Sequence, residues 1–264
     1  FTFTGTAPGP GTIQATSAIA NGVTIQNNRF VDVASSFGAV YTDNAPQTDG
    51  WVITANLFQN IGFDGDWNNL TAASASALNP WQASNITIPN NLIEGVAYNA
   101  INFETVSGGV IQDNVIRDVG KSGLQLANEC VGPVSITNNV FERCNQRFAI
   151  DYNFWYGAIK WYASGNEVTA TGNFTITGNV MDDCVVGYLF ARVLPTTGGP
   201  TITFEDNTIT NNSLAGLLQY RPGGADITVE HAYWGDASGP ALALFDYESV
   251  PSGTDPTPYV TAIG

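Results

Sequence analysis

A short phrase recurs along this chain: an apolar strand, a polar turn that ends in Asn, and an apolar residue two places further on. The Asn of the seven complete copies is Asn28, Asn56, Asn91, Asn114, Asn139, Asn179 and Asn207. An eighth copy, ITVEHAYW, has Ala232 in the Asn position. A repeat of this length cannot bury its apolar face alone and must stack on its neighbours, so the repeat limits the fold to architectures built by stacking.

Three columns of residues keep a fixed distance from the Asn. The residue three places before it is Ile25, Ile53, Ile88, Ile111, Ile136, Ile176, Phe204 and Val229. The residue two places after it is Phe30, Phe58, Ile93, Ile116, Phe141, Met181, Ile209 and Trp234. The residue five places after it is Val33, Ile61, Val96, Val119, Cys144, Cys184 and the polar exception Asn212. We expect these columns to point inward as ladders, with each Asn in a bend, because Asn tolerates left-handed backbone.

A second short strand begins about nine residues after the Asn. It reads GAVY from Gly38, AINF from Ala100, GLQL from Gly123, FAIDY from Phe148, GYLF from Gly187 and GLLQY from Gly216. Strands with a period of two and no helical pattern between them exclude βαβ units. We therefore expect coils of strand, Asn turn, short strand, bend, strand and return, stacked at about 4.8 Å per coil.

This pattern resembles the right-handed parallel β-helix family, the fold of pectate lyases, polygalacturonases, phage tailspikes and many bacterial surface proteins. The resemblance covers roughly Val23 to Pro240. It implies an all-β, single-stranded right-handed parallel β-helix, or β-solenoid, of about eight coils and about 40 Å in length. It implies little about function, because one fold carries many activities.

The two ends of the chain are expected to flank the β-helix of residues 23–240. Residues 1–22 hold an alternating strand, FTFTG, and the segment leading into the helix, and residues 241–264 form a tail or linker that ends in YVTAIG. Terminal coils expose unpaired backbone, and these two strands could pair with a neighbouring copy and build head-to-tail filaments. The alternative is a segment from which flanking domains were removed.

The excess of acidic over basic residues limits the classes of partner that the protein can bind. The chain carries 23 acidic and 8 basic residues, which argues against nucleic acid, whose phosphates need Lys and Arg. No apolar run reaches the length of about 18 residues that a spanning helix needs, so we expect no membrane insertion. An acidic surface suits a soluble protein in a salty medium and attracts divalent cations. We expect a secreted, extracellular or cell-surface protein that requires no cofactor, with Ca²⁺ as the candidate ion.

Few residues are candidates for catalysis. His231 is the only histidine and lies at a turn position. Asp182 and Asp183 resemble the Asp residues of polygalacturonases, but the basic and Gly-His-Gly motifs of those enzymes are missing. Met181 and Cys184 flank the pair and belong to inward columns, so at least one of the two Asp residues is an outward strand residue. The sequence therefore favours a protein without a catalytic site.

Two insertions lengthen the repeat, and loops on a rigid scaffold are where function concentrates. The first insertion contains Asp64, Asp66 and Asn68, at the alternating spacing of calcium ligands but without the chelating Glu of a complete EF-hand loop. A calcium loop and an ordinary Asx-rich turn both fit this spacing. Trp67 and Trp81 lie near enough in sequence to flank a ligand.

The second insertion is rich in aromatic residues. They are Tyr152, Phe154, Trp155, Tyr156, Trp161 and Tyr162. Aromatic faces stack on sugar rings and also anchor protein interfaces, so sugar binding, protein contact and packing against the solenoid remain open.

The sequence favours a structural or adhesive β-helix that contacts other copies of itself, head to tail or laterally. The alternative is a polysaccharide-binding module, lyase or hydrolase, with a surface polysaccharide as the partner.

Overall fold

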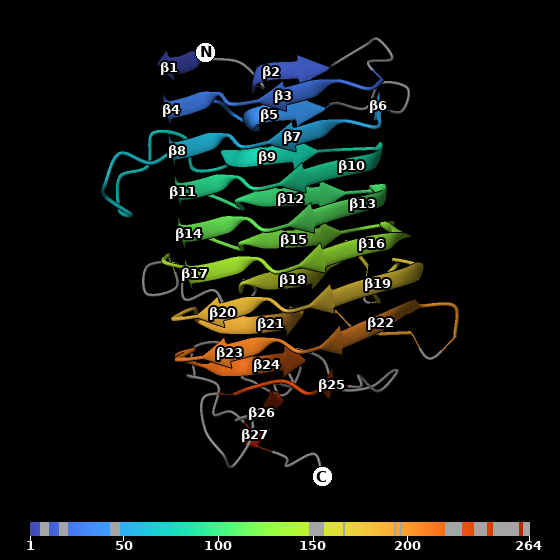
Figure 1. The fold of residues 1–264 in the computed structure, drawn as a ribbon. Coiled ribbons are helices and arrows are strands. Elements are labelled where there is room, and N and C mark those ends of the chain that lie inside the picture. The colour runs from blue at the N-terminus through green and yellow to red at the C-terminus, as the bar shows by residue number, and fades with distance from the viewer. Residues whose placement is uncertain are drawn as a thin grey trace.

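The protein is a rod of stacked β-strands (Figure 1). The structure is a computed structural model that describes residues 1–5, 11–15, 21–42, 48–147, 156–165, 167–192, 194–195, 197–219, 229–234, 242–244 and 259–260. Within these residues every regular element is a strand, and the strands form three sheets in which neighbouring strands are parallel, except for the last pair of the third sheet. The predicted all-β parallel solenoid is confirmed. The described part of the chain has no helix that could cross a membrane.

Each coil gives one strand to each sheet, in the order second sheet, Asn turn, first sheet, third sheet. The first sheet contains β1 (Thr2–Gly5), β4 (Arg29–Val33), β8 (Leu57–Ile61), β11 (Leu92–Val96), β14 (Val115–Val119), β17 (Val140–Cys144), β20 (Val180–Asp182) and β23 (Thr208–Thr210). The second contains β3 (Thr24–Gln26), β7 (Val52–Thr54), β10 (Ala83–Pro89), β13 (Ser107–Gln112), β16 (Val131–Thr137), β19 (Gly172–Thr177), β22 (Pro200–Glu205) and β25 (Val229–Glu230), and β6 (Thr48–Asp49) pairs with β10. The third contains β2 (Gly11–Ala15), β5 (Gly38–Thr42), β9 (Ser76–Pro80), β12 (Ile101–Glu104), β15 (Leu124–Ala127), β18 (Ile159–Tyr162), β21 (Val186–Phe190), β24 (Ala215–Gln219), β26 (Leu242–Leu244) and β27 (Tyr259–Val260).

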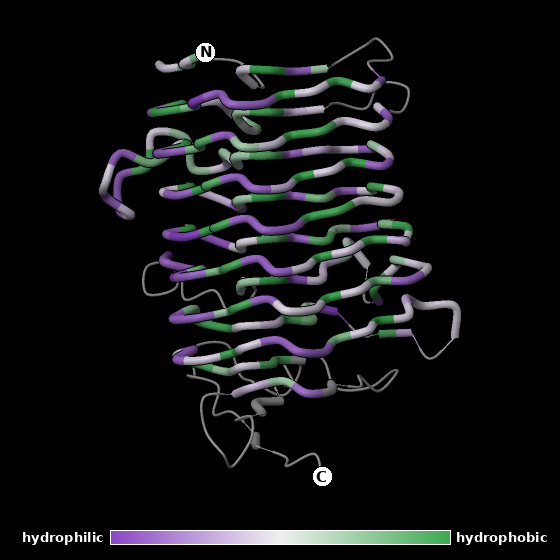
Figure 2. Tube along the Cα trace, viewed as in Figure 1, coloured by the Kyte–Doolittle hydropathy of each residue, from purple (hydrophilic) through white to green (hydrophobic). Residues whose placement is uncertain are grey.

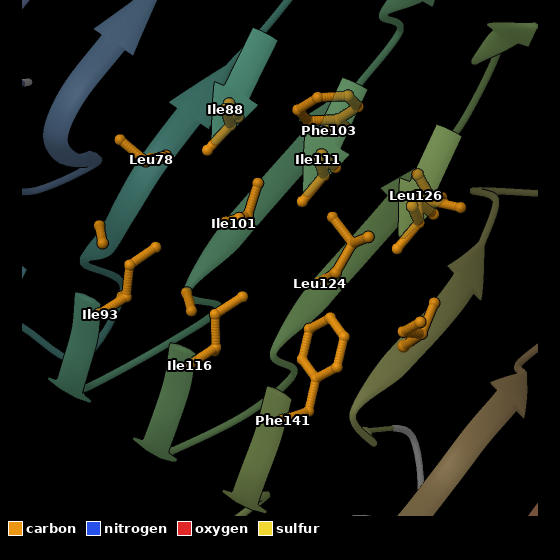
Figure 3. Packing of buried hydrophobic residues seen from close by; sticks show 14 of the residues in the cluster. Leu78, Ile88, Ile93, Ile101, Phe103, Ile111, Ile116, Leu124, Leu126 and Phe141 are labelled. Carbon is orange, nitrogen blue, oxygen red and sulfur yellow. The ribbon is translucent and has the colours of Figure 1, made fainter. Parts of the chain in front are cut away.

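The apolar columns form the core, as the repeat predicts. Ile88, Ile111 and Ile136 follow one another in register across β10, β13 and β16, and all three are fully buried. In Figure 3, Ile88 and Ile111 face side chains that come from the other two sheets, such as Ile116 and Leu124. Hydrophobic and hydrophilic residues alternate along the coils (Figure 2). Burying one such side chain contributes about 2 kcal/mol, and the ladder repeats that contribution in every coil.

The seven Asn residues form a second, polar ladder inside the rod. The backbone N–H and the side-chain Nδ2 of each of the first six Asn residues donate to Oδ1 of the next Asn, over 2.8–3.2 Å. In the last six Asn residues, Nδ2 also donates to the carbonyl of an Ile in the preceding coil, over 2.7–2.9 Å. All seven residues are buried. Because buried amides are stable only when bonded, the ladder fixes how one coil lies on the next.

The bend itself differs from the prediction. The left-handed residue is the one before the ladder Asn, as in Asn90 with φ 57° and Asp113 with φ 54°. A second left-handed column follows four places after the Asn and includes Asp118 and Arg143. The ladder Asn is not left-handed, because its side chain must turn inward to reach the Asn residues above and below it.

The third-sheet strand of the coil that contains the second insertion also differs from the prediction. The sequence pattern put a strand at Phe148, but residues 148–155 lie outside the described part of the chain, and the third-sheet strand of this coil is β18. Its register is fixed by Ile159 opposite Leu124 and Trp161 opposite Leu126. The described strands that flank the two insertions belong to the same two sheets: the first insertion follows β8 and precedes β9, and the second follows β17 and precedes β18. The period-two signal alone could not choose between two alternating segments in one coil.

The two ends of the rod differ. β1, β2 and β3 are the first strands of their sheets, and Phe3 on β1 stacks on Phe30, with ring centroids 4.8 Å apart. At the other end, the expected strand at YVTAIG is present as β27, but it runs antiparallel to β26 of the same chain. It therefore does not offer the parallel edge that a head-to-tail junction was expected to use.

The thiols of Cys144 and Cys184 lie on adjacent coils of the first sheet. They are unbridged, and the Cys144 backbone N–H donates to Sγ of Cys184 over 3.3 Å. Burial raises the pKa of the Cys144 thiol well above its usual value. Both residues act as small apolar members of the inward column.

Candidate functional site

The three candidates for catalysis do not form one site, although Asp182 and Asp183 are adjacent in the sequence. Asp182 points outward from β20 and accepts hydrogen bonds from Oγ1 of Thr210, over 2.7 Å, and Nδ2 of Asn211, over 2.8 Å. Asp183 is exposed in the second left-handed column. His231 is exposed in the first left-handed column, with Nδ1 3.8 Å from Oδ1 of Asp206. This arrangement offers no nucleophile paired with a base, and each position has a role in a turn or between coils.

The calcium candidates form a local turn. The Asp66 carboxylate accepts hydrogen bonds from the backbone N–H of Asn68, over 2.9 Å, and from its Nδ2, over 3.0 Å. These bonds lower the pKa of Asp66. The Asp64 carboxylate in turn accepts the Asp66 N–H, over 3.3 Å. Groups of three or more His, Cys, Asp or Glu side chains able to hold a metal do not occur in the described ranges. The contacts are those of an Asx turn, and calcium binding here stays a prediction.

The aromatic candidates separate into three groups. Trp67 stacks on Phe63, with ring centroids 3.9 Å apart, and Trp81 is held through its backbone N–H, which donates to Oγ1 of Thr42. Trp161 is not a surface residue as expected: it is fully buried in the core and donates from Nε1 to the hydroxyl of Tyr188 over 2.6 Å. The physical reason is that β18 begins later than predicted, which puts Trp161 at an inward position. Tyr152, Phe154 and Trp155 lie outside the described residues.

Tyr156 and Tyr162 meet three basic residues that the sequence pattern did not single out. The Nζ atoms of Lys121 and Lys160 lie 4.4 Å and 4.1 Å from the centroid of the Tyr156 ring. Lys160 Nζ is also 4.8 Å from the Tyr162 ring, and the Arg192 guanidinium is 4.9 Å from the same ring. We call these five residues the cation–tyrosine cluster. Its three cations are almost completely buried, whereas the two tyrosines are partly exposed.

A column of amides leads to this cluster along the outer side of the third sheet. Asn102 Nδ2 donates to Oδ1 of Asn79 over 2.9 Å, and Gln125 Nε2 donates to Oδ1 of Asn102 over 2.8 Å. Gln125 is directly opposite Lys160 in the pairing of β15 with β18. The column runs from β9 to β18, the two strands that follow the insertions. Amides, tyrosine rings and cations thus share one face between the two loops.

One comparison with known families decides the classification. The family described as "Right handed beta helix region" matches residues 13–180, more than half of the chain. The chain belongs to the right-handed β-helix family. It matches none of the curated proteins with which it was compared. Membership of the β-helix family fixes the architecture and leaves the function to be argued from the site.

In this β-helix the electrostatics of the cluster are unusual. Burial, together with the positive charges of Arg192 and Lys121, holds the pKa of Lys160 well below its usual value. Strongly shifted pKa values are concentrated at functional sites, although structural networks of charged residues also produce them. The sequence offered one signal that could have found the cluster: the chain has only two lysines, and both belong to it.

Proposed function

We propose that the protein is a secreted or cell-surface β-helical rod with a structural or adhesive role rather than an enzyme. Supporting this, outward charges are used to join coils. The Arg117 guanidinium lies 2.6 Å from a Glu94 carboxylate oxygen on the neighbouring strand, and Glu94 also accepts a hydrogen bond from Gln59 over 2.8 Å. Arg143 pairs with Asp118 in the same way, over 2.7 Å. A first sheet whose outer charges are paired along the axis suits a rigid rod.

The observation that carries the proposal is the N-terminal end. Among the described residues, β1, β2 and β3 each pair on one side only, so each presents an open edge of backbone groups. Among the described residues, the Phe3–Phe30–Phe58 stack ends there at Phe3, which is partly buried against the core. Open strand edges beside apolar rings favour pairing with another chain. A second copy that places β25, the last described strand of its second sheet, on these edges would lengthen the rod, since a head-to-tail contact that does not close propagates.

Replacing Phe3 by Asp tests this assembly. The substitution puts a charge at the end of the stack, and we expect self-association to weaken about 100-fold, equivalent to about 3 kcal/mol for a buried aromatic anchor. Sedimentation velocity measures the association, and circular dichroism checks that the β-rich fold is retained. Phe37→Asp is the matched control, because Phe37 is exposed on the side of the rod and stacks on Tyr41. Equal association of the wild type and Phe3→Asp would count against the N-terminal end as the contact.

A second candidate function, polysaccharide binding, is favoured by the amide column and its neighbouring tyrosine rings. Affinity electrophoresis in gels that contain neutral or uronic-acid polysaccharides tests it, and Gln125→Ala should reduce any retardation, because Gln125 links the column to the cluster. We expect no turnover of these polymers. Release of unsaturated or reducing ends that depends on Asp182, Asp183 or His231 would overturn the non-catalytic role.

A further inference from the structure

Four Asn residues of the chain begin the sequence Asn-x-Ser/Thr, the acceptor pattern for an N-linked glycan. They are Asn69, Asn85, Asn173 and Asn211. All four belong to the described residues and are exposed. Because a repeat rich in Asn and Thr also produces this pattern by chance, the surroundings of each side-chain amide have to separate acceptor sites from chance matches.

Two of the four amides are bound to a carboxylate of the neighbouring coil. Nδ2 of Asn85 donates to Oδ1 of Asp49 over 2.8 Å, and Nδ2 of Asn211 donates to Oδ1 of Asp182 over 2.8 Å. Hydrogen bonds to a charged acceptor are stronger than those between neutral groups. The same nitrogen has to be free to receive a sugar, so these bonds hold Asn85 and Asn211 back from modification.

Asn173 has a free amide on the outer face of the second sheet. The side chains of Phe174 and Ile176 are buried in the core, so those of Asn173 and Thr175 point outward from β19 by the alternation of a strand. Both are exposed, and the Asn173 amide has no hydrogen-bond partner among the described residues. The amide and the hydroxyl of the pattern are therefore presented together to solvent.

Asn69 lies in the first insertion, which extends away from the rod between β8 and β9 (Figure 1). Its backbone N–H donates to the carbonyl of Asp66 over 3.1 Å, which fixes the turn without using the side chain. Asn69 and Thr71 are both exposed, and in the part of the chain that the structure describes the Asn69 amide has no hydrogen-bond partner. A surface loop is the usual setting of an N-linked glycan.

We propose that Asn69 and Asn173 are N-glycosylation sites and that Asn85 and Asn211 are not. The inference rests on the proposed secreted or cell-surface role, because the glycan is transferred to chains that leave the cytoplasm. In the reaction, Nδ2 of the Asn attacks the anomeric carbon of an oligosaccharide that is carried on a lipid diphosphate. The bond between Nδ2 and this carbon forms as the bond from the carbon to the diphosphate oxygen breaks. The diphosphate leaves with the electron pair, and the amide proton passes to a base of the transferring enzyme.

Secretion of the full chain from a eukaryotic host tests the proposal. A leader peptide delivers the chain to the transferring enzyme whatever its native location. A glycan-removing amidase converts each occupied Asn to Asp in isotope-labelled water, and peptide mass spectrometry then measures the occupancy of the four positions. We expect the occupancy of Asn69 and Asn173 to exceed that of Asn85 and Asn211 by at least about tenfold, the factor that corresponds to one hydrogen bond to a carboxylate. Absence of a glycan from both Asn69 and Asn173, or equal occupancy of all four positions, would overturn the proposal.

Variants separate the pattern from the accessibility of the amide. Thr71→Ala and Thr175→Ala should each abolish the glycan at its own site only, whereas Thr175→Ser should retain it. Thr177→Ala is the matched control, since Thr177 lies on the same strand outside the pattern and its loss should leave the occupancy unchanged. Asp49→Ala frees the Asn85 amide and should raise the occupancy of Asn85 about tenfold. An unchanged occupancy of Asn85 in Asp49→Ala would contradict the role of the amide bond.

Glycosylation and end-to-end assembly are separable, because neither site lies on β1, β2 or β3. Sedimentation velocity of the same glycosylated samples measures self-association. Glycosylated rods that stay monomeric would count against the proposed assembly and would support the two sites. Rods that assemble but carry no glycan would overturn the two sites and leave the assembly standing.

Discussion

Replacing Asn114 by Ala is expected to lower the free energy of unfolding by about 4 kcal/mol, because several buried polar groups lose their partners at once. Its Nδ2 donates to the carbonyls of Ile88 and Gln112 and to Oδ1 of Asn139, over 2.7, 3.0 and 2.9 Å. Its Oδ1 accepts both the backbone N–H and the Nδ2 of Asn91, over 2.8 and 3.0 Å. Ala satisfies none of these five bonds and also leaves a cavity.

Asn28→Ala is the matched control at the end of the same ladder. The Asn28 side chain donates to the carbonyl of Gln26 and to Oδ1 of Asn56, and no donor to its own Oδ1 is recorded in the described residues. It is also the most exposed of the seven, at 9%. We expect a loss of about 1 kcal/mol, measured by urea unfolding. Equal losses for the two variants would mean that the interior ladder does not act as a cooperative network.

Replacing Ile136 by Asp should cost about 5 kcal/mol or more and prevent folding at neutral pH, because a carboxylate would enter a dry core. Ile136 is fully buried and pairs with Ile111 and Ile176 in the adjacent coils. Burial would raise the pKa of the new carboxyl, so the destabilisation should shrink as the pH falls and the acid becomes neutral.

Ser135→Asp is the control for Ile136→Asp. Ser135 is next to Ile136 on β16, but it is partly exposed on the outer side and pairs with Val110 and Thr175. We expect Ser135→Asp to change the unfolding free energy by no more than about 0.5 kcal/mol. Thermal unfolding followed by circular dichroism compares the two. Similar stability of Ile136→Asp and Ser135→Asp would contradict the inward direction of this column.

The fold could be predicted because its signal repeats. Ile25, Ile88 and Ile136 hold the same place in the first, third and fifth copies of the repeat, and stacking turns that spacing into a buried ladder. The direction of the Asn side chains was harder to predict, because Asn suits an exposed left-handed turn as well as a buried ladder. The residue that carries the left-handed backbone is its neighbour, and only the bonds between coils reveal this.

The candidate site was less predictable than the fold. Lys121, Lys160 and Arg192 are far apart in the sequence and meet only because β15, β18 and β21 are neighbouring strands of the third sheet. The position of Lys160 depends on which alternating segment of its coil becomes β18, and periodicity could not decide that. The same error of register assigned Trp161 to a surface loop when it is a core residue.

Electron microscopy of the wild-type protein tests the central claim most directly, since the claim is that the rod extends through its N-terminal end. Eight coils at about 4.8 Å each give one copy a length of about 40 Å. At high protein concentration we predict rods whose lengths are multiples of this value, without side branches. Particles that all remain one copy long at every concentration would contradict the claim.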